Sequence, residues 1–292
     1  PTILTDQSEY RFCAGTAGAQ IQFNIANGTP GYNIQFHPPT GIASPNNNIS
    51  LASPTDTTMY KVVVVDASGC PSDTAEFAVY PIPVPIADAG RDAILCEGAQ
   101  GGVQLNGSAT GGGFGSYIYQ WVPAQGLSDP NIFNPYATPS QTTIYQLIVT
   151  SNQTGCSSIV NTLDTLQTVV VEVVPKPIAN AAPTDTIDIC PGESVQLGDL
   201  PTNVYGDTVF VWTPTDGLSN PNINRPIATP AFTTTYQLTV YTKGCSSDAD
   251  RVTVRVNPRP TVAAPPVLSV CPGDSVQINA TVSGAPGPYT YL

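Results

Sequence analysis

The sequence predicts an all-β protein built as a tandem array of small β-sandwich domains, three complete and one truncated. Short alternating segments rich in Val, Ile, Thr and Tyr are separated by Gly, Pro and Asn, which is the pattern of strands and turns. No segment offers eleven or more residues at helical spacing, and 30 Pro and 25 Gly are spread along the 292 residues. Six or seven strands in about 85 residues are typical of a β-sandwich.

The repeat itself is visible in two stretches, WVPAQGLSDPN from Trp121 and WTPTDGLSNPN from Trp212, with a looser copy, FHPPTGIASPN, from Phe36. In each copy a tyrosine follows the aromatic residue by 24 positions, and a Gly-Cys pair comes after it. The tyrosines are Tyr60, Tyr145 and Tyr236. A spacing kept three times, with Gly, Pro and Thr-Thr also in register, indicates repeated domains.

Three linkers, VYPIPVPIADAG, VVPKPIANAAP and VNPRPTVAAPP, each contain Pro-x-Pro, which favours extended, semi-rigid spacers. We therefore expect boundaries near 82, 176 and 259. Repeat 1 is residues 1–82 and is diverged, repeat 2 is 83–176, repeat 3 is 177–259, and repeat 4 begins at 260. Repeat 4 stops at residue 292, just before its core aromatic is due, so we expect a truncated copy of a longer array.

The six aromatic residues of the repeat are expected to fill the domain cores. Phe36, Trp121 and Trp212 lie in the middle of strands, where a large side chain can fill the space between two sheets. Each tyrosine opens a later strand, where its hydroxyl can fix the preceding turn, as in a tyrosine corner. We prefer this interpretation to a cofactor site or a sugar-binding platform.

Seven cysteines are distributed two, two, two and one among the repeats. Pairing within repeats predicts the disulfides Cys13–Cys70, Cys96–Cys156 and Cys190–Cys245, with Cys271 left without its partner. Metal ligation is the rival interpretation, but there is no CxxC pair and His37 is the only histidine. A cysteine nucleophile would also need a His base. Disulfides place the protein outside the cytoplasm.

Composition limits the partners. Only 10% of residues are charged, and 9 basic against 21 acidic residues give a net charge of −12. Such a chain repels phosphate backbones and anionic lipids, so we expect neither nucleic acid nor direct membrane insertion. Calcium is compatible with the carboxylate surplus, although solubility explains the surplus as well. No apolar run approaches the roughly 20 residues of a membrane helix, and no signal-peptide pattern follows Pro1.

The sequence predicts no enzyme and no cofactor. Histidine is almost absent, and the carboxylates stand singly in turns. GGGFG at 111–115 lies between two β segments without a helix that could face a phosphate, so we interpret it as a loop insertion.

The complete pattern, Cys-x-Gly-Glu/Asp-Ser-Val, Trp-x-Pro-x-x-Gly-Leu-Ser-x-Pro-Asn, Ala-x-Pro-x-x-Thr-Thr-x-Tyr and Gly-Cys, resembles the repeats of giant secreted surface proteins of Bacteroidota. It is most similar to SprB-type gliding-motility adhesins, whose repeats resemble immunoglobulin-like and PKD-like domains. Two departures stand out. Repeat 1 has Phe36 in place of Trp. The second cysteine lies 9 to 11 residues after the tyrosine, so the expected bridge ties down an end of the sandwich.

The resemblance implies export by the type IX secretion system and O-glycosylation at Asp-Ser/Thr followed by a small or aliphatic residue. The matching acceptors are Thr57, Thr74, Thr165, Thr186, Thr208 and Ser275.

We expect an extracellular, cell-surface stalk that carries a distal adhesive region. Its partners are further repeats of the same polypeptide and an external surface, polysaccharide or cell-surface protein. The alternative is that the repeats bind such a partner through their own loops, at 109–117 or 151–167, with Tyr117 and Tyr119 as candidates. Lateral assembly into filaments by strand exchange is a third possibility.

Overall fold

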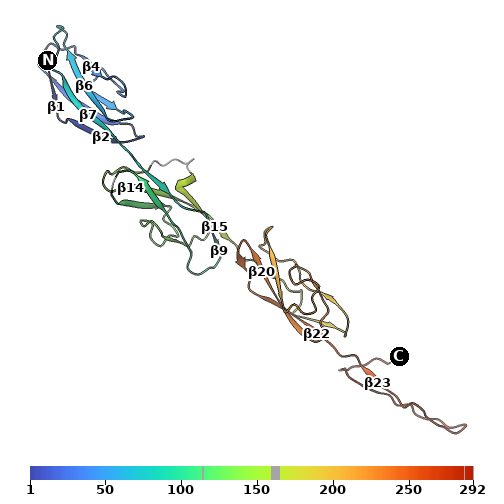
Figure 1. The fold of residues 1–292 in the computed structure, drawn as a ribbon. Helices are drawn as coiled ribbons and strands as arrows, with labels where there is room; N and C mark the ends of the chain where they lie inside the picture. Colours follow the sequence, from blue (N-terminus) through green and yellow to red (C-terminus); the bar gives the residue numbers. More distant parts are fainter. Residues whose placement is uncertain (114, 159–164, 286, 292) are drawn as a thin grey trace. The chain divides into compact units, whose positions relative to one another are not determined.

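The computed structural model describes residues 1–113, 115–158, 165–285 and 287–291. These residues form two compact units, one of Pro1–Leu95 with Ala99–Val173 and one of Cys96–Gly98 with Val174–Leu292. In the described residues the regular elements are β-strands, apart from one 3₁₀ turn at Thr165–Gln167 (Figure 1). The protein is thus all-β, an array of β-sandwiches, as the alternating sequence pattern predicts; the immunoglobulin-like form of the sandwich is what the family resemblance implies.

The first sandwich pairs a four-stranded sheet with a three-stranded sheet. The larger sheet has the order β2-β7-β6-β4, and the smaller has the order β1-β3-β5. The strands of the larger sheet are β2 (Glu9–Cys13), β7 (Ala75–Ile82), β6 (Thr58–Val65) and β4 (Asn33–His37); those of the smaller are β1 (Thr2–Thr5), β3 (Ala19–Ala26) and β5 (Ile49–Ala52). All pairs are antiparallel except β2 with β7, which is parallel.

The alternation of buried and exposed residues along these strands explains the sandwich. In β3, Ala19, Ile21 and Phe23 are buried while the residues between them are exposed. In β6, Tyr60, Val62 and Val64 are buried in the same way. Because successive side chains of a strand point to opposite faces, each sheet presents one apolar face, and the two faces share one core.

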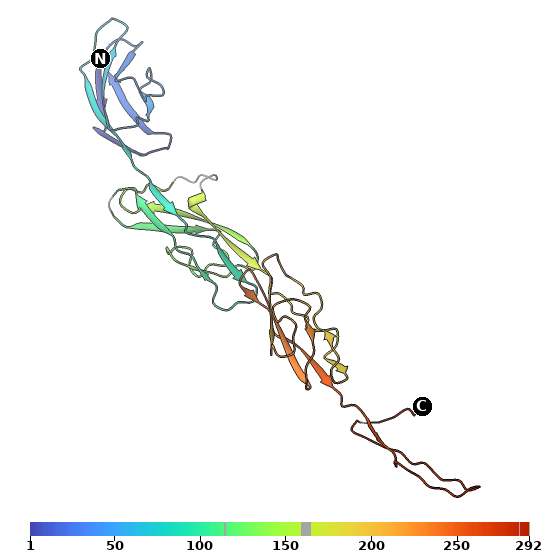
Figure 2. The same ribbon diagram turned by 45° about the vertical axis from the view of Figure 1, so that its right-hand side comes forward.

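The second sandwich is built around the sheet β12-β14-β15-β9. Its strands are β12 (Tyr117–Val122), β14 (Thr143–Ser151), β15 (Thr168–Val174) and β9 (Ala93–Cys96). Two short pairs complete it: β8 (Pro85–Asp88) with β11 (Ser108–Gly111), and β10 (Val103–Gln104) with β13 (Tyr136–Ala137). Trp121, Tyr145 and Leu147 lie at the centre of its core. Figure 2 shows β14 and β15 side by side.

The third sandwich repeats this plan. Its main sheet has the order β16-β22-β20-β18, with β21 paired to β20, and β17 pairs with β19. The strands are β16 (Thr186–Ile189), β17 (Val195–Gln196), β18 (Val209–Thr213), β19 (Ile227–Ala228), β20 (Thr234–Thr242), β21 (Cys245–Ser246) and β22 (Asp250–Val256). As in the first sandwich, the first strand of the sheet, β16, runs parallel to the last, β22. Its core contains Trp212, Tyr236 and Leu238.

Within 260–285 and 287–291, the described residues form only the antiparallel pair β23 (Thr261–Ala263) and β24 (Thr281–Ser283). Apolar residues that are buried in repeat 3 have exposed counterparts here. Leu197 is 0% exposed, whereas Ile278, at the same place in the Cys-x-Gly motif, is 72% exposed. The domain boundaries near 82, 176 and 259 stay a prediction, and the three core clusters fall on either side of the first two.

Candidate functional site: disulfides between consecutive repeats

Two disulfides join the repeats, and neither was predicted. Cys13 of repeat 1 is bonded to Cys156 of repeat 2, and Cys96 of repeat 2 is bonded to Cys245 of repeat 3. Both Cα–Cα distances are 5.5 Å, within the usual range for a disulfide. The predicted pairs Cys13–Cys70, Cys96–Cys156 and Cys190–Cys245 are therefore wrong. All seven cysteines lie in the described part of the chain, and Cys70, Cys190 and Cys271 are free.

Strand topology explains the correction in repeat 1. Cys13 is the last residue of β2 and lies opposite Ile82, the last residue of β7. Cys70 precedes the start of β7, in the hairpin that joins β6 to β7. The eight residues of β7 separate the two cysteines by about 25 Å at 3.3 Å per residue. A disulfide requires Cα atoms within about 7 Å, so the two ends of one sandwich cannot be bridged.

The same separation recurs in repeat 3. Cys190 follows Ile189, which lies opposite Val256 at the end of β22. Cys245 lies in the hairpin before β22 begins, so the seven residues of that strand stand between the two cysteines. In both repeats the first cysteine is beside the end of the last strand, where the chain leaves for the next repeat. The second cysteine is at the opposite end of that strand.

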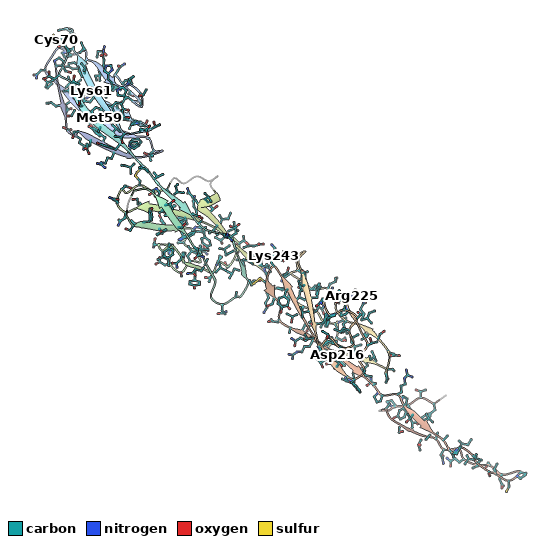
Figure 3. All side chains as sticks on the ribbon, viewed as in Figure 1. Met59, Lys61, Cys70, Asp216, Arg225 and Lys243 are labelled. Carbon is teal, nitrogen blue, oxygen red and sulfur yellow. A yellow bond between two sulfur atoms is a disulfide. The ribbon has the colours of Figure 1, made fainter. Side chains whose placement is uncertain are left out.

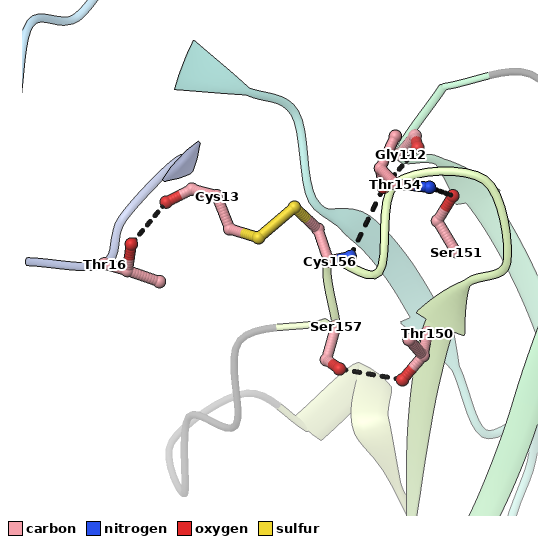
Figure 4. Close-up of a disulfide and its surroundings, with 8 residues drawn as sticks. All are labelled: Cys13, Thr16, Gly112, Thr150, Ser151, Thr154, Cys156 and Ser157. Carbon is pink, nitrogen blue, oxygen red and sulfur yellow. Dashed lines mark hydrogen bonds between the residues drawn. A yellow bond between two sulfur atoms is a disulfide. The ribbon is translucent and has the colours of Figure 1, made fainter. Parts of the chain in front are cut away.

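The bonded cysteines are held by local hydrogen bonds. Figure 4 shows the bond between Cys13 and Cys156, with Thr16 Oγ1 donating to the Cys13 carbonyl at 2.7 Å. The Cys156 N–H donates to Thr154 Oγ1 at 3.3 Å. After Cys96, the Glu97 N–H donates to the Val174 carbonyl at 2.8 Å, which fixes the turn against the last strand of repeat 2.

Cys156 and Cys245 share one further hydrogen bond, made by a serine that follows each of them. The serine two positions after each cysteine folds back on the preceding strand, where Val149 N–H donates to Ser158 Oγ at 3.1 Å and Val240 N–H to Ser247 Oγ at 2.9 Å. Both cysteines are almost fully buried, at 2% and 1% exposed. These hydrogen bonds fix the hairpin, and with it the position of the cysteine sulfur atom.

The two disulfide loops overlap along the chain. The first spans 143 residues and the second 149, and the segment between Cys96 and Cys156 belongs to both. Consequently every peptide bond from Cys13 to Cys245 lies inside at least one covalent loop.

The predicted core aromatics are all buried, at 3% exposure or less. The three tyrosine hydroxyls each donate to a backbone carbonyl twenty residues earlier: Tyr60 to Thr40 at 2.7 Å, Tyr145 to Gln125 at 2.9 Å and Tyr236 to Asp216 at 2.8 Å. Burial raises the pKa of each of these tyrosines. Trp121 Nε1 donates to the Ile132 carbonyl at 2.9 Å and Trp212 Nε1 to the Ile223 carbonyl at 3.0 Å.

The candidate binding residues Tyr117 and Tyr119 lie in strand β12, not in a loop, and contact residues of their own sandwich. Tyr117 and Tyr119 are partly buried and pack against the second core. The Tyr117 hydroxyl donates to the Gly111 carbonyl at 2.8 Å, and the Tyr119 ring lies 6.1 Å from the Phe133 ring. Of the two candidate loops, residue 114 and residues 159–164 lie outside the described residues.

The six glycosylation acceptors differ in accessibility. Thr57, Thr74 and Ser275 are exposed, whereas Thr186 and Thr208 are half-buried, and the Thr208 hydroxyl donates to the Tyr205 carbonyl. The motif of Thr165 begins at residue 164, outside the described residues. Glycosylation at all six stays a prediction.

Acidic side chains do not gather into a cation site in the parts of the chain that are described. Among these residues no group of three or more His, Cys, Asp or Glu could hold a metal ion. Carboxylates instead bind backbone N–H groups or lysine. Asp250 accepts from Ala181 N–H at 2.7 Å, and Asp248 accepts from Lys176 Nζ at 2.7 Å. Across 1–113, 115–158, 165–285 and 287–291, no helix has the length and apolar character needed to span a bilayer.

Comparison with known proteins identifies no family for this chain. No protein-family model matches the chain, and no curated protein matches its sequence. The chain is similar to several solved multidomain structures. The three N-terminal domains of the bacteriophage RB49 highly immunogenic outer capsid protein are 13% identical, with a TM-score of 0.45 over 87% of this chain and 99% of that one. Titin I67–I69 is 11% identical, with a TM-score of 0.41 over 87% and 98%.

The extracellular domains 3–5 of Drosophila OTK are 12% identical, with a TM-score of 0.38 over 87% of this chain and 97% of that one. At identities below 25% and TM-scores below 0.5, these similarities carry no inference about function.

Proposed function

We propose that the chain is part of an extracellular stalk in which each β-sandwich is covalently bonded to the next, so that the array resists tension. The observation that carries this proposal is the pair of disulfides between consecutive repeats, Cys13–Cys156 and Cys96–Cys245. Disulfides persist in oxidising compartments, which supports a location outside the cytoplasm. A low content of charged residues and a net charge of −12 agree with a surface that repels other polyanions.

The covalent topology explains how such a stalk would carry load. When the two ends of the chain are pulled apart, extension is limited by the shortest covalent path between them. That path runs from the N-terminus to Cys13, crosses to Cys156, returns along the chain to Cys96, and crosses to Cys245. The segments 13–96 and 156–245 are bypassed. Most of the first and third sandwiches therefore bears no load through its backbone.

Single-molecule pulling tests the proposal. The bypassed segments contain about 170 residues, so oxidised protein should reach a contour length about 600 Å shorter than reduced protein, at roughly 3.5 Å per residue. The double variant Cys13→Ser, Cys96→Ser should behave like reduced protein under oxidising conditions. The variant Cys70→Ser is the matched control, because Cys70 is free. Equal contour lengths for oxidised and reduced protein would rule the stalk mechanism out.

We further propose that the parent protein is a large attachment or gliding adhesin of the SprB type, secreted by the type IX system. The support is the sequence resemblance of the repeat. In this view the repeats hold a distal adhesive region away from the cell, and polysaccharide or a surface protein is the target of that region. Specific binding of surface polysaccharide by residues 1–292 would favour the loops of the repeats as the binding site instead.

A further inference from the structure

The two disulfides follow one rule. In each, the cysteine of a Cys-x-Gly motif is bonded to the cysteine of a Gly-Cys motif in the following repeat. Three exposed cysteines remain, and each belongs to one of these two kinds. Cys190 and Cys271 begin Cys-Pro-Gly motifs, whereas Cys70 ends a Gly-Cys motif.

Cys190 has the same local structure as bonded Cys13. Cys13 ends the first strand of its main sheet and Cys190 directly follows its own, and in both repeats that strand runs parallel to the last one. Each begins a turn in which the N–H three residues later donates to the cysteine carbonyl, from Thr16 at 3.1 Å and from Glu193 at 3.0 Å. The glycine at the third position has φ of +82° in the first turn and +85° in the second, as this kind of turn requires.

Two further hydrogen bonds hold the backbone on either side of Cys190. Its N–H donates to Glu193 Oε2 at 2.9 Å, and Asn257 N–H donates to the Ile189 carbonyl at 2.9 Å. The thiol is therefore presented beside the end of the last strand of repeat 3, where Cys13 and Cys96 stand in their own repeats. A repeat that follows repeat 3 would meet it there.

Cys70 has the same local structure as Cys156 and Cys245. The serine two positions later, Ser72, accepts from Val64 N–H at 2.9 Å and donates its own N–H to the Val64 carbonyl at 2.7 Å. The hairpin is further held by Asp66, which accepts from the N–H groups of Cys70 and Ser68 at 2.9 and 3.0 Å. Figure 3 shows Cys70 at the tip of the first sandwich.

One difference separates Cys70 from its counterparts. Cys156 and Cys245 are almost fully buried, and each is bonded to a cysteine of the preceding repeat, whereas Cys70 is exposed. The serine hydrogen bond is the same in all three repeats, so the difference in exposure coincides with the presence or absence of the bond to a preceding repeat.

We propose that Cys190 and Cys70 are the two open halves of further disulfides of the same kind. The partner of Cys190 is the Gly-Cys cysteine of a fourth repeat, and the partner of Cys70 is the Cys-x-Gly cysteine of a repeat that precedes repeat 1. This inference rests on the proposed stalk and extends its covalent path in both directions. It assigns the two surfaces by which a neighbouring repeat of the same pattern docks.

The chemistry is a two-electron oxidation by a small-molecule disulfide such as oxidised glutathione. The thiolate of Cys190 attacks one sulfur of glutathione disulfide, which releases one glutathione thiolate and leaves a mixed disulfide. The thiolate of the neighbouring repeat then attacks the Cys190 sulfur and releases the second glutathione. Two cysteine thiols lose two protons and two electrons, and one glutathione disulfide becomes two glutathione thiols.

The first test completes repeat 4 in register. Leu292 stands 21 residues after Cys271, as Val211 stands 21 residues after Cys190, so residues 212–259 can be appended directly after Leu292. Ser246→Ala in the appended copy marks its cysteine peptide by mass. After refolding in a glutathione buffer and alkylation, non-reducing peptide mapping is expected to find Cys190 bonded to the appended copy of Cys245. In the control Cys190→Ser, the appended cysteine should be alkylated.

The second test works at the other end. Pro1-Thr2 repeats Pro260-Thr261, so residues 177–259 can be placed directly before Pro1. The original Cys190 is replaced by Ser, which makes the new copy of Cys190 unique. It should bond to Cys70, and Cys70→Ser should leave it alkylated.

In both chains the bonds Cys13–Cys156 and Cys96–Cys245 serve as internal controls for folding. Each test decides its own cysteine. A new bond within one repeat, such as Cys271 with the appended cysteine, would overturn the proposal, as would a thiol that stays reduced while both control bonds form. The contour length of residues 1–292 depends on the bonds Cys13–Cys156 and Cys96–Cys245 and not on a bond of Cys70 or Cys190. Failure of the present proposal is therefore distinguishable from failure of the stalk mechanism.

Discussion

Removing the bond between repeats 1 and 2 is expected to weaken the protein in a way that identifies the pairing. The variants are Cys13→Ser, Cys156→Ser and the double variant, with Cys70→Ser as the matched control. Each of the first three breaks the same bond, so all three should lose the same stability. Had the bonds formed within repeats, Cys13→Ser would act on repeat 1, Cys156→Ser on repeat 2, and their effects would add.

The magnitude follows from the loop that the bond closes. Cys13 and Cys156 are 143 residues apart, and the chain-entropy relation gives about 5 kcal/mol for a loop of that length. If repeat 1 unfolds while repeat 2 stays folded, the mobile loop is roughly half as long and the loss is about 4 kcal/mol. Cys13 is half-buried, so little packing is lost with its sulfur.

Guanidinium unfolding followed by far-UV circular dichroism measures the effect, and tryptophan fluorescence follows repeats 2 and 3 without repeat 1, because the two tryptophans of the chain are Trp121 and Trp212. We expect the first transition to move to lower denaturant by an amount worth about 4–5 kcal/mol in all three variants, and Cys70→Ser to match the wild type. Two results would refute the reasoning. One is a double variant that loses the sum of the single losses, and the other is a Cys70→Ser variant that loses as much as Cys13→Ser.

Three further predictions concern single sandwiches. Tyr145→Phe removes the bond to the Gln125 carbonyl and should cost about 1–2 kcal/mol, measured by urea unfolding with tryptophan fluorescence; an unchanged midpoint would contradict the role of the hydroxyl. Gly126→Ala should cost about 1 kcal/mol more than Gly155→Ala, because both have positive φ but a Cβ at Gly126 would lie 3.0 Å from Tyr145 Oη and a Cβ at Gly155 meets nothing within 4 Å. The N–H groups of Cys70, Thr29 and Ser68 hold the pKa of Asp66 below its usual value, so this carboxylate stabilises repeat 1 above about pH 4 and the stability is lost as pH falls through the lowered pKa. Asp66→Asn should flatten the fall in melting temperature between pH 4 and pH 2, and an unaltered slope would exclude Asp66 as its source.

The core of each repeat could be predicted because it depends on local pattern. Trp121 and Trp212 stand at the same place in two copies of one motif, and alternation along β3 and β6 sets the buried faces. A side chain two positions along a strand returns to the same face, so the apolar pattern alone decides which residues meet in the core. Each tyrosine hydroxyl was expected to fix the preceding turn; its partner in the structure is a carbonyl twenty residues earlier, four positions after the core aromatic.

The pairing of the cysteines depends on information that lies outside any one motif. Both Cys13 and Cys70 belong to repeat 1 in sequence, and counting two cysteines per repeat favours a bond between them. The sequence did contain one signal, the place of each motif among the expected strands. The Cys-x-Gly motif comes at the end of the first strand of the main sheet, and the Gly-Cys motif lies in the hairpin before the last strand. Using that signal requires knowing that the first and last strands run parallel, so that the two motifs stand at opposite ends of the sandwich.

The amino-acid sequence by itself determined that the chain repeats, that each repeat is a β-sandwich, and which aromatic residues fill it, because these follow from short-range periodicity and from spacing. Only the tertiary structure decided which sulfur atoms meet, because a disulfide forms between residues that are close in space. Parallel pairing of β2 with β7, and of β16 with β22, moves the two cysteines of a repeat to opposite ends of its sheet. The bonds Cys13–Cys156 and Cys96–Cys245 therefore join modules instead of closing them.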